Sequence, residues 1–318
     1  MNDFLPLSGE DKLILLDLLY RPSMSLKSSQ DNSTYSYRQF LRKIDRFIAQ
    51  NVIQGWVPIF HPNILGQKLV WFFLRTNPRG PQDLDYLQSL KGQIISLAGI
   101  AGSFSLLALM QFQNDADFNA SLANIDRHFS VPNPVFYPLR YQYLEIIAFY
   151  KFNGFVTSEK SKELAIFEKD LMNSLNLLGH KSNRPPTVED IADHLKVSSS
   201  TVQKHLKSME SNHTILGYSI ILNSYYKPPV KTIVQFNVHP GSYNSVVDLL
   251  QEDPHIFLLC KIQIETFNLL AVVYSLSIRD FDIWLKELYK NEGILDTLTS
   301  VVLNDDFPVN NPLLFPIL

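Results

Sequence analysis

The chain contains almost no cysteine. A single residue, Cys260, occurs in 318, which excludes a disulfide-stabilised scaffold and a zinc site built only of thiolates. No apolar run reaches the roughly 18 residues that a membrane-spanning helix needs. The first ten residues lack the basic and apolar regions of a signal peptide. We therefore expect a cytoplasmic protein that has no membrane partner.

Sequence motifs for catalysis and metal binding are also missing. The eight histidines are scattered, without the HxH or HxxxH spacing that would predict a metal site. No glycine-rich phosphate loop and no Ser-His-Asp order occurs. The sequence thus predicts no catalytic residue, no metal and no cofactor, and we do not expect an enzyme. A net charge of −3 excludes a protein coated in positive charge but allows a local basic face.

What the chain does contain is an internal repeat. Its two halves come into register when the sequence is shifted by about 162 residues. The block Phe104–Ala108 then matches Phe267–Ala271, and Asp117-Phe118 follows as Asp280-Phe281. Because 46% of the residues are hydrophobic, each half can build a core. A tandem duplication is the simplest account.

The second half begins with helical signals. Thr187 and Asp190 resemble a capping box for a helix over 188–195, and Ser198 can cap a third helix. The inward positions of that third helix follow a helical spacing: Val202, Leu206 and Met209. Three short helices with a tight turn before the third are typical of a helix-turn-helix module, with an ordinary three-helix bundle as the alternative.

After Gly217 the pattern changes to strands and helices in the order β-α-β-β-α-β, that of a ferredoxin-like domain. The predicted elements are 232–238, 243–250, 256–264, 267–274, 280–289 and 298–302, repeated in the first half as 69–74, 84–90, 94–99, 104–110, 118–128 and 141–149. The fold class is therefore α+β, with two repeats of a winged helix-turn-helix domain followed by a ferredoxin-like domain. We place the domains at 1–60, 61–152, 153–222 and 223–318, with a polar linker over 151–163.

The segment Asp193–Glu210 resembles the recognition segment of the Lrp/AsnC (feast/famine) transcription regulators. It matches in its apolar positions, in the serine after the turn and in the final glutamate. The order of modules resembles that family's layout twice over. The resemblance implies a sequence-specific, nucleoid-associated regulator that binds double-stranded DNA. It also implies association through the ferredoxin-like sheets, as a homo-oligomer or as an intramolecular pseudo-dimer, and a pseudo-dimer with unequal modules should prefer an asymmetric site.

Candidate DNA-binding residues gather at the start of the third helix, where side chains reach base edges and backbone N–H groups face phosphate. They are Ser198, Ser199, Ser200, Thr201, Gln203, Lys204, His205 and Lys207. Gln203 can recognise adenine by a bidentate pair. A solvated charged face is the alternative interpretation of the same residues.

The first half is less regular. Its expected middle helix, 25–34, has one large apolar residue where its counterpart has three, so we expect this module to be altered. The segment that corresponds to the recognition helix keeps its apolar positions. The candidate DNA contacts of the first half are Tyr37, Arg38, Gln39, Arg42 and Lys43.

Two other functions fit the same layout. Sirohaem decarboxylases resemble paired Lrp/AsnC units and need histidine and arginine around a tetrapyrrole's carboxylates, for which His128, Arg140, His239 and His255 are the candidates. No clustered basic pocket is visible in the sequence. The other alternative is an interaction scaffold that has lost DNA binding, which the eroded first module favours and the basic third helix of the second half opposes.

Overall fold

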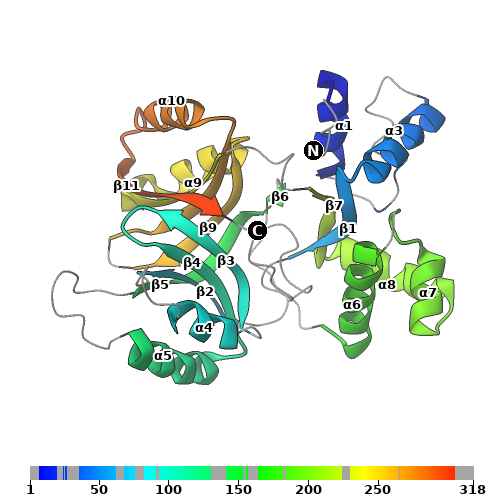
Figure 1. Cartoon of the computed structure of the whole chain (residues 1–318), viewed down its shortest axis with the longest axis horizontal. Helices are drawn as coiled ribbons and strands as arrows, with labels where there is room; N and C mark the ends of the chain where they lie inside the picture. The colour runs from blue at the N-terminus through cyan, green and yellow to red at the C-terminus, as the bar shows by residue number, and fades with distance from the viewer. Residues whose placement is uncertain are drawn as a thin grey trace. The chain divides into compact units, whose positions relative to one another are not determined.

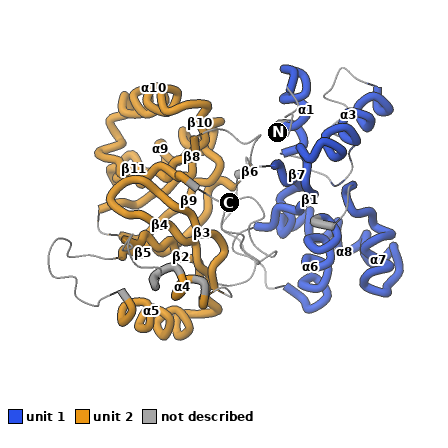
Figure 2. Tube along the Cα trace, viewed as in Figure 1, with its two compact units in different colours: residues 1–64, 161–227, 312–317 blue, residues 65–160, 228–311, 318 orange. Residues whose placement is uncertain are grey.

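The computed structural model describes residues 7–19, 24, 26, 36–61, 68–75, 82–90, 93–129, 141–152, 155–156, 164–181, 184–223, 230–264 and 266–304. The chain divides into two compact units, one made chiefly of residues 1–64 and 161–227 and the other of 65–160 and 228–311 (Figure 2). Each unit therefore combines one segment from each sequence repeat. Among the described residues, no helix is long and apolar enough to cross a membrane.

The first unit holds the two helix-turn-helix modules (Figure 1). The first module consists of α1 (Gly9–Leu19), α3 (Tyr37–Ala49) and the wing strand β1 (Ile53–Phe60). The second consists of α6 (Ile166–Lys181), α7 (Val188–Leu195), α8 (Ser199–Ser211) and the wing strand β7 (Ile215–Leu222). Apart from Leu26, the predicted altered helix at 25–34 lies outside the described residues.

The two wing strands pair with each other. β1 and β7 run antiparallel, and Val57 lies opposite Ser219, its own counterpart under the 162-residue shift. A pseudo-two-fold axis therefore passes between these residues. Ile220 of β7 is fully buried in the core of the first module, and α6 of the second module packs on β1. Each module is thus completed by a strand of the other.

The second unit contains both ferredoxin-like domains. The first has β2 (Lys68–Leu74), α4 (Gln82–Ser89), β3 (Ile94–Ala101), β4 (Leu106–Phe112), α5 (Asp115–Phe129) and β5 (Tyr141–Phe152), followed by the short β6 (Phe155–Val156). The second has β8 (Val230–Val238), the 3-10 turn η2 (Pro240–Ser242), α9 (Tyr243–Glu252), β9 (Ile256–Gln263), β10 (Leu269–Ser275), α10 (Ile278–Leu288) and β11 (Ile294–Asn304). This confirms the predicted fold class and the order of elements.

The strands of the two domains form one continuous ring. The order is β2-β4-β3-β11-β8-β10-β9-β5, and β2 also pairs with β5, which closes it. The last strand of each domain extends onto the other, since β5 pairs with β9 and β11 with β3. Sheet pairing of the kind expected between subunits therefore occurs inside one chain, as a pseudo-dimer.

Alternation along the strands gives each domain two buried faces. Val234 and Phe236 lie in a core beneath α9 and α10, and Val70 and Phe72 lie in the matching core of the first domain. The opposite faces point into the ring, where Cys260 lies beside Trp71 of the other repeat and burial raises the pKa of its thiol. Cys260 is thus a buried core residue.

The predicted linker over 151–163 begins too early. Lys151 and Phe152 continue β5, paired with Leu259 and Leu258 of β9. The Lys151 ammonium is buried and donates a hydrogen bond to the carbonyl oxygen of Asp253 at 2.6 Å. Burial lowers the pKa of Lys151, while the nearby Asp253 partly offsets that effect. A polar residue at this position therefore serves to hold the two repeats together.

Candidate nucleic-acid interface

The turn between α7 and α8 is defined by two caps. Thr187 and Asp190 form the predicted capping box at the start of α7, and Ser198 caps α8 by accepting a hydrogen bond from the Thr201 backbone at 3.2 Å. The hydrogen bond from the Thr187 backbone lowers the pKa of Asp190, and the pairing with Arg184 adds to this. Lys196 ends α7 in the left-handed conformation (φ 57°, ψ 43°), which produces the tight turn.

One face of α8 is buried and the opposite face is open to solvent. Val202, Leu206 and Met209 are buried, as the helical spacing predicted. The exposed residues recur every four positions and so form a stripe along the helix: Ser199, Ser200, Gln203, Lys204, Lys207 and Ser208. We call this set the α8 stripe.

Three of the predicted contacts in the second module have other roles. The hydroxyl groups of Ser198 and Thr201 lie 2.8 Å apart within the cap. The ring of His205 is half-buried, with its centroid 4.7 Å from that of Phe167. The structure therefore places Gln203, Lys204 and Lys207 in the open stripe, and His205 against α6.

The acidic residue of α8 is held away from the stripe. Glu210 accepts a hydrogen bond from the hydroxyl of Tyr218 on the wing strand β7, at 2.8 Å. Between Lys196 and Met209 the sequence has no carboxylate. The α8 stripe is therefore positively charged on a chain whose net charge is −3.

In the first module, α3 also has an open face, with Tyr37, Arg38, Gln39 and Arg42 exposed. Its N-terminus carries a capping box in which the Gln39 Oε1 accepts from the Ser36 backbone at 3.0 Å and from the Ser36 hydroxyl at 2.8 Å. That carbonyl oxygen is thus engaged in the cap. Gln39 therefore differs from Gln203, which lies exposed in the α8 stripe.

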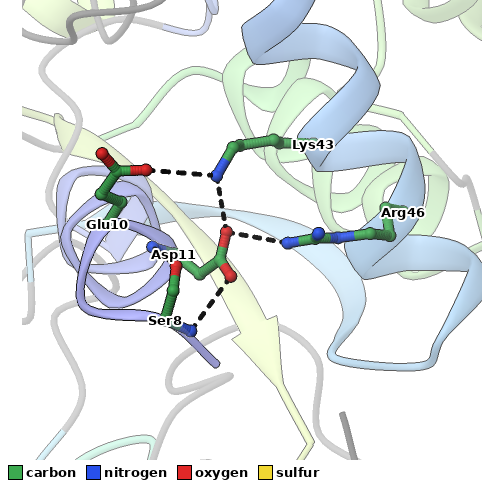
Figure 3. Close-up of polar contacts among 5 residues, drawn as sticks. All are labelled: Ser8, Glu10, Asp11, Lys43 and Arg46. Atoms are coloured by element: carbon green, nitrogen blue, oxygen red, sulfur yellow. Dashed lines mark hydrogen bonds and ion pairs between the residues drawn. The ribbon is translucent and has the colours of Figure 1, made fainter. Parts of the chain in front are cut away.

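Lys43 is used inside the module. Its ammonium lies 2.8 Å from the Asp11 carboxylate on α1 and 3.9 Å from that of Glu10, and Arg46 lies 2.8 Å from Asp11 (Figure 3). Asp11 is 4% exposed. We call Asp11, Lys43 and Arg46 the Asp11 clamp. It was missed in the sequence, because nothing in the spacing of residues 11, 43 and 46 indicates that α1 and α3 meet there.

The histidines named for the decarboxylase alternative have separate partners. His128 stacks on Tyr86 with ring centroids 4.0 Å apart, His239 accepts a hydrogen bond from the backbone of Gly241, and His255 pairs with Asp253 at 3.0 Å. Arg140 lies outside the described residues. In the part of the chain that the structure describes, no group of three or more His, Cys, Asp or Glu side chains is arranged to hold a metal.

Comparison with known proteins supports the helix-turn-helix assignment. Residues 175–211, which span the end of α6 through α8, match the family model described as a bacterial regulatory protein of the arsR family. A search of curated protein sequences finds no relative. The motif is therefore shown for the second module, while the family of the whole chain is not.

The fold of the whole chain matches a solved enzyme. The sirohaem decarboxylase NirDL is 11% identical, with a TM-score of 0.62, over 93% of this chain and 91% of that one. Its complex with an iron-uroporphyrin III analogue gives 11% identity and a TM-score of 0.61, over 93% and 92%. The leucine response regulatory protein LrpA of Mycobacterium tuberculosis is 18% identical over 46% of this chain and 96% of its own, with a TM-score of 0.40.

These matches correct one expectation. The sequence led us to expect no enzyme, and that expectation is wrong, because the architecture that covers 93% of the chain is one that a decarboxylase uses. Short motifs mark only catalysis that depends on a local sequence, so their absence does not exclude an enzyme. Residues brought together by a pseudo-two-fold arrangement leave no such signature.

Proposed function

We propose that the protein is a transcription regulator that binds specific double-stranded DNA through α8. The observation that carries the proposal is the α8 stripe, which aligns Gln203, Lys204 and Lys207 on the open face of a capped helix after a tight turn. In helix-turn-helix proteins this helix enters the major groove with its N-terminal residues against base edges. The wing strand β7 keeps the single carboxylate of the helix away from that face.

The division of roles follows from chemistry. Lys204 and Lys207 neutralise phosphates and so contribute affinity that falls with salt. Gln203 donates and accepts hydrogen bonds at once, which suits the N6 and N7 atoms of adenine. Ser199 and Ser200, at the N-terminus of the helix, lie where backbone N–H groups favour a phosphate.

The test begins with selection of genomic DNA fragments by the full chain at about 50 and 200 mM salt. On the selected site, Lys204→Ala with Lys207→Ala should lower affinity about ten-fold and reduce the salt slope by about 2. The matched control is Lys286→Ala with Lys290→Ala, which removes the same charge from exposed ion pairs on α10 and just after its end. Equal affinity of both double variants would show that α8 does not make the contact, and failure to retain DNA at either salt concentration would favour the interaction scaffold instead.

The full-length match to NirDL favours a second candidate function. Under it, the protein removes carboxylate groups from a tetrapyrrole, and the two ferredoxin-like domains bind the substrate. Cations in these domains would pair with the carboxylates. The candidate histidines among the described residues are His255, whose ring nitrogen lies 3.0 Å from the Asp253 carboxylate, His128, which is stacked on Tyr86, and His239.

Titration with iron uroporphyrin tests this candidate separately from DNA binding. Binding should shift the visible absorbance of the iron porphyrin. Turnover, measured with sirohaem, should release carbon dioxide and give a product lighter than the substrate by the mass of that carbon dioxide. His255→Gln should weaken turnover, while Lys204→Ala should leave it unchanged. An unchanged spectrum at a ligand excess would reject the second candidate and leave the first untouched.

A further inference from the structure

The two modules present different chemistry on equivalent helices. Under the 162-residue shift, the buried residues Phe40, Ile44 and Phe47 of α3 fall on Val202, Leu206 and Met209 of α8, so the helices correspond position by position. The exposed positions of the α8 stripe can therefore be compared directly with those of α3.

At the position that corresponds to Gln203, α3 has no polar side chain. Leu41 replaces Gln203, and exposed Asp45 replaces Lys207. Gln39 does not substitute for Gln203, because its carbonyl oxygen is held in the capping box and a bidentate contact to adenine needs both the oxygen and the nitrogen.

What α3 retains is charge suited to phosphate. Exposed Arg42 corresponds to Lys204, and exposed Arg38 corresponds to Ser200. Lys43 and Arg46 are engaged by Asp11, at 2.8 Å each (Figure 3). Arg38 and Arg42, one helical turn apart, thus lie on the same open face.

The two modules are held in one compact unit. The pairing of β1 with β7, with Ile220 buried in the core of the first module, connects α3 and α8 within the same chain. The two helices are therefore presented together, without a second copy.

We propose that one chain binds one bipartite DNA site, in which α8 recognises the bases and α3 contacts only the phosphate backbone through Arg38 and Arg42. The inference rests on the proposed DNA-binding function. The DNA site that it specifies has one half of defined sequence and one half of arbitrary sequence. Fixed sequence is expected on the α8 side alone, because Leu41 occupies the position of α3 that corresponds to Gln203, and Arg38 and Arg42 occupy positions that correspond to the phosphate contacts proposed for α8.

The test is sequence selection from a random duplex library by four forms of the full chain. Arg38→Ala with Arg42→Ala should lower affinity about ten-fold and the salt slope by about 2 without changing the selected sequence. Gln203→Ala should instead relax the selected sequence at one or two positions. Asp45→Lys should raise affinity several-fold, again for an unchanged sequence. Sedimentation of the complex should give one chain per duplex.

Each other outcome overturns the inference. A changed selected sequence in the Arg38/Arg42 variant would show that α3 recognises bases. Unchanged affinity of that variant would show that α3 does not touch DNA. Two chains per duplex would show that the two modules that bind one site come from different copies of the chain. If Lys204→Ala with Lys207→Ala weakens binding while the α3 variants do not, only this inference fails. If neither the Lys204/Lys207 variant nor the α3 variants weaken binding, the proposed function fails as well. Unchanged thermal melting of the exposed-residue variants separates these effects from misfolding.

Discussion

The Asp11 clamp shows how a single carboxylate organises the first module. Burial alone would raise the pKa of Asp11, but hydrogen bonds from Lys43 and Ser8 outweigh it and lower that pKa from 3.8 to about 2. A carboxyl whose pKa is lower in the folded state stabilises the fold above its unfolded pKa. The stabilisation is therefore complete above about pH 5 and disappears as the pH falls through about 2.

Asp11→Asn should accordingly lower the free energy of unfolding by about 2 kcal/mol at neutral pH. Chemical denaturation of both proteins between about pH 2 and 7 measures the difference, which should shrink toward acid. Asp282→Asn is the control, because its pair with Lys286 lies on the surface and surface pairs contribute about 0–1 kcal/mol. A pH-independent difference for Asp11→Asn would contradict the electrostatic origin of the effect.

Residue roles were the hardest part of the molecule to predict from sequence. Lys204 and Lys43 look alike, since each is a basic residue on an amphipathic helix, yet Lys204 is exposed and Lys43 pairs with Asp11. The difference depends on a contact between α1 and α3, in which Asp11 and Lys43 lie 32 residues apart in the chain. Buried apolar positions such as Val202 were predictable because helical spacing alone determines them.

At the scale of elements, the close packing of α6 on β1 depends on Gly179. A Cβ atom at this position would overlap the carbonyl oxygen of Trp56 and lie 2.9 Å from its carbonyl carbon. Both neighbours are backbone atoms, which cannot rotate away. Glycine here thus permits the helix of one module to approach the wing strand of the other.

Gly179→Ala should destabilise the protein by about 1–3 kcal/mol or more, because α6 must move away from β1. The matched control is Gly9→Ala at the start of α1, where no atom lies within 4 Å of the added carbon, so little change is expected. Thermal unfolding of the two variants gives the comparison. Equal melting temperatures would show that the contact is not needed.

Helices and strands were predicted well, because their periodicity is local. The helix over 188–195 was placed with the bounds that α7 has, and all six elements of each ferredoxin-like domain were found in order. The last strand of each domain was predicted too short, as 141–149 and 298–302 against Tyr141–Phe152 and Ile294–Asn304. These are the strands that cross to the other repeat, and their ends are paired by partners distant in sequence.

The whole molecule is built from two halves that cannot complete their structures alone. In the second unit, β5 of the first repeat pairs with β9, and β11 of the second pairs with β3. In the first unit, β1 pairs with β7. A separated half would leave the partners of all these strands unpaired, and its ring-facing side chains, among them Cys260 and Trp71, would meet water.

Residues 1–160 and 161–318, expressed as separate chains in one cell, should therefore copurify as a one-to-one complex. Each half alone should aggregate or form a homodimer, which uses the same edges in a two-fold arrangement. Light scattering on eluted fractions measures both. Two soluble, folded monomeric halves that do not associate would contradict this view, because the inter-repeat ladders would then contribute no stability. Recovery of DNA binding only in the complex would further show that the pairing of the halves, and not either half alone, sets the geometry of the two modules.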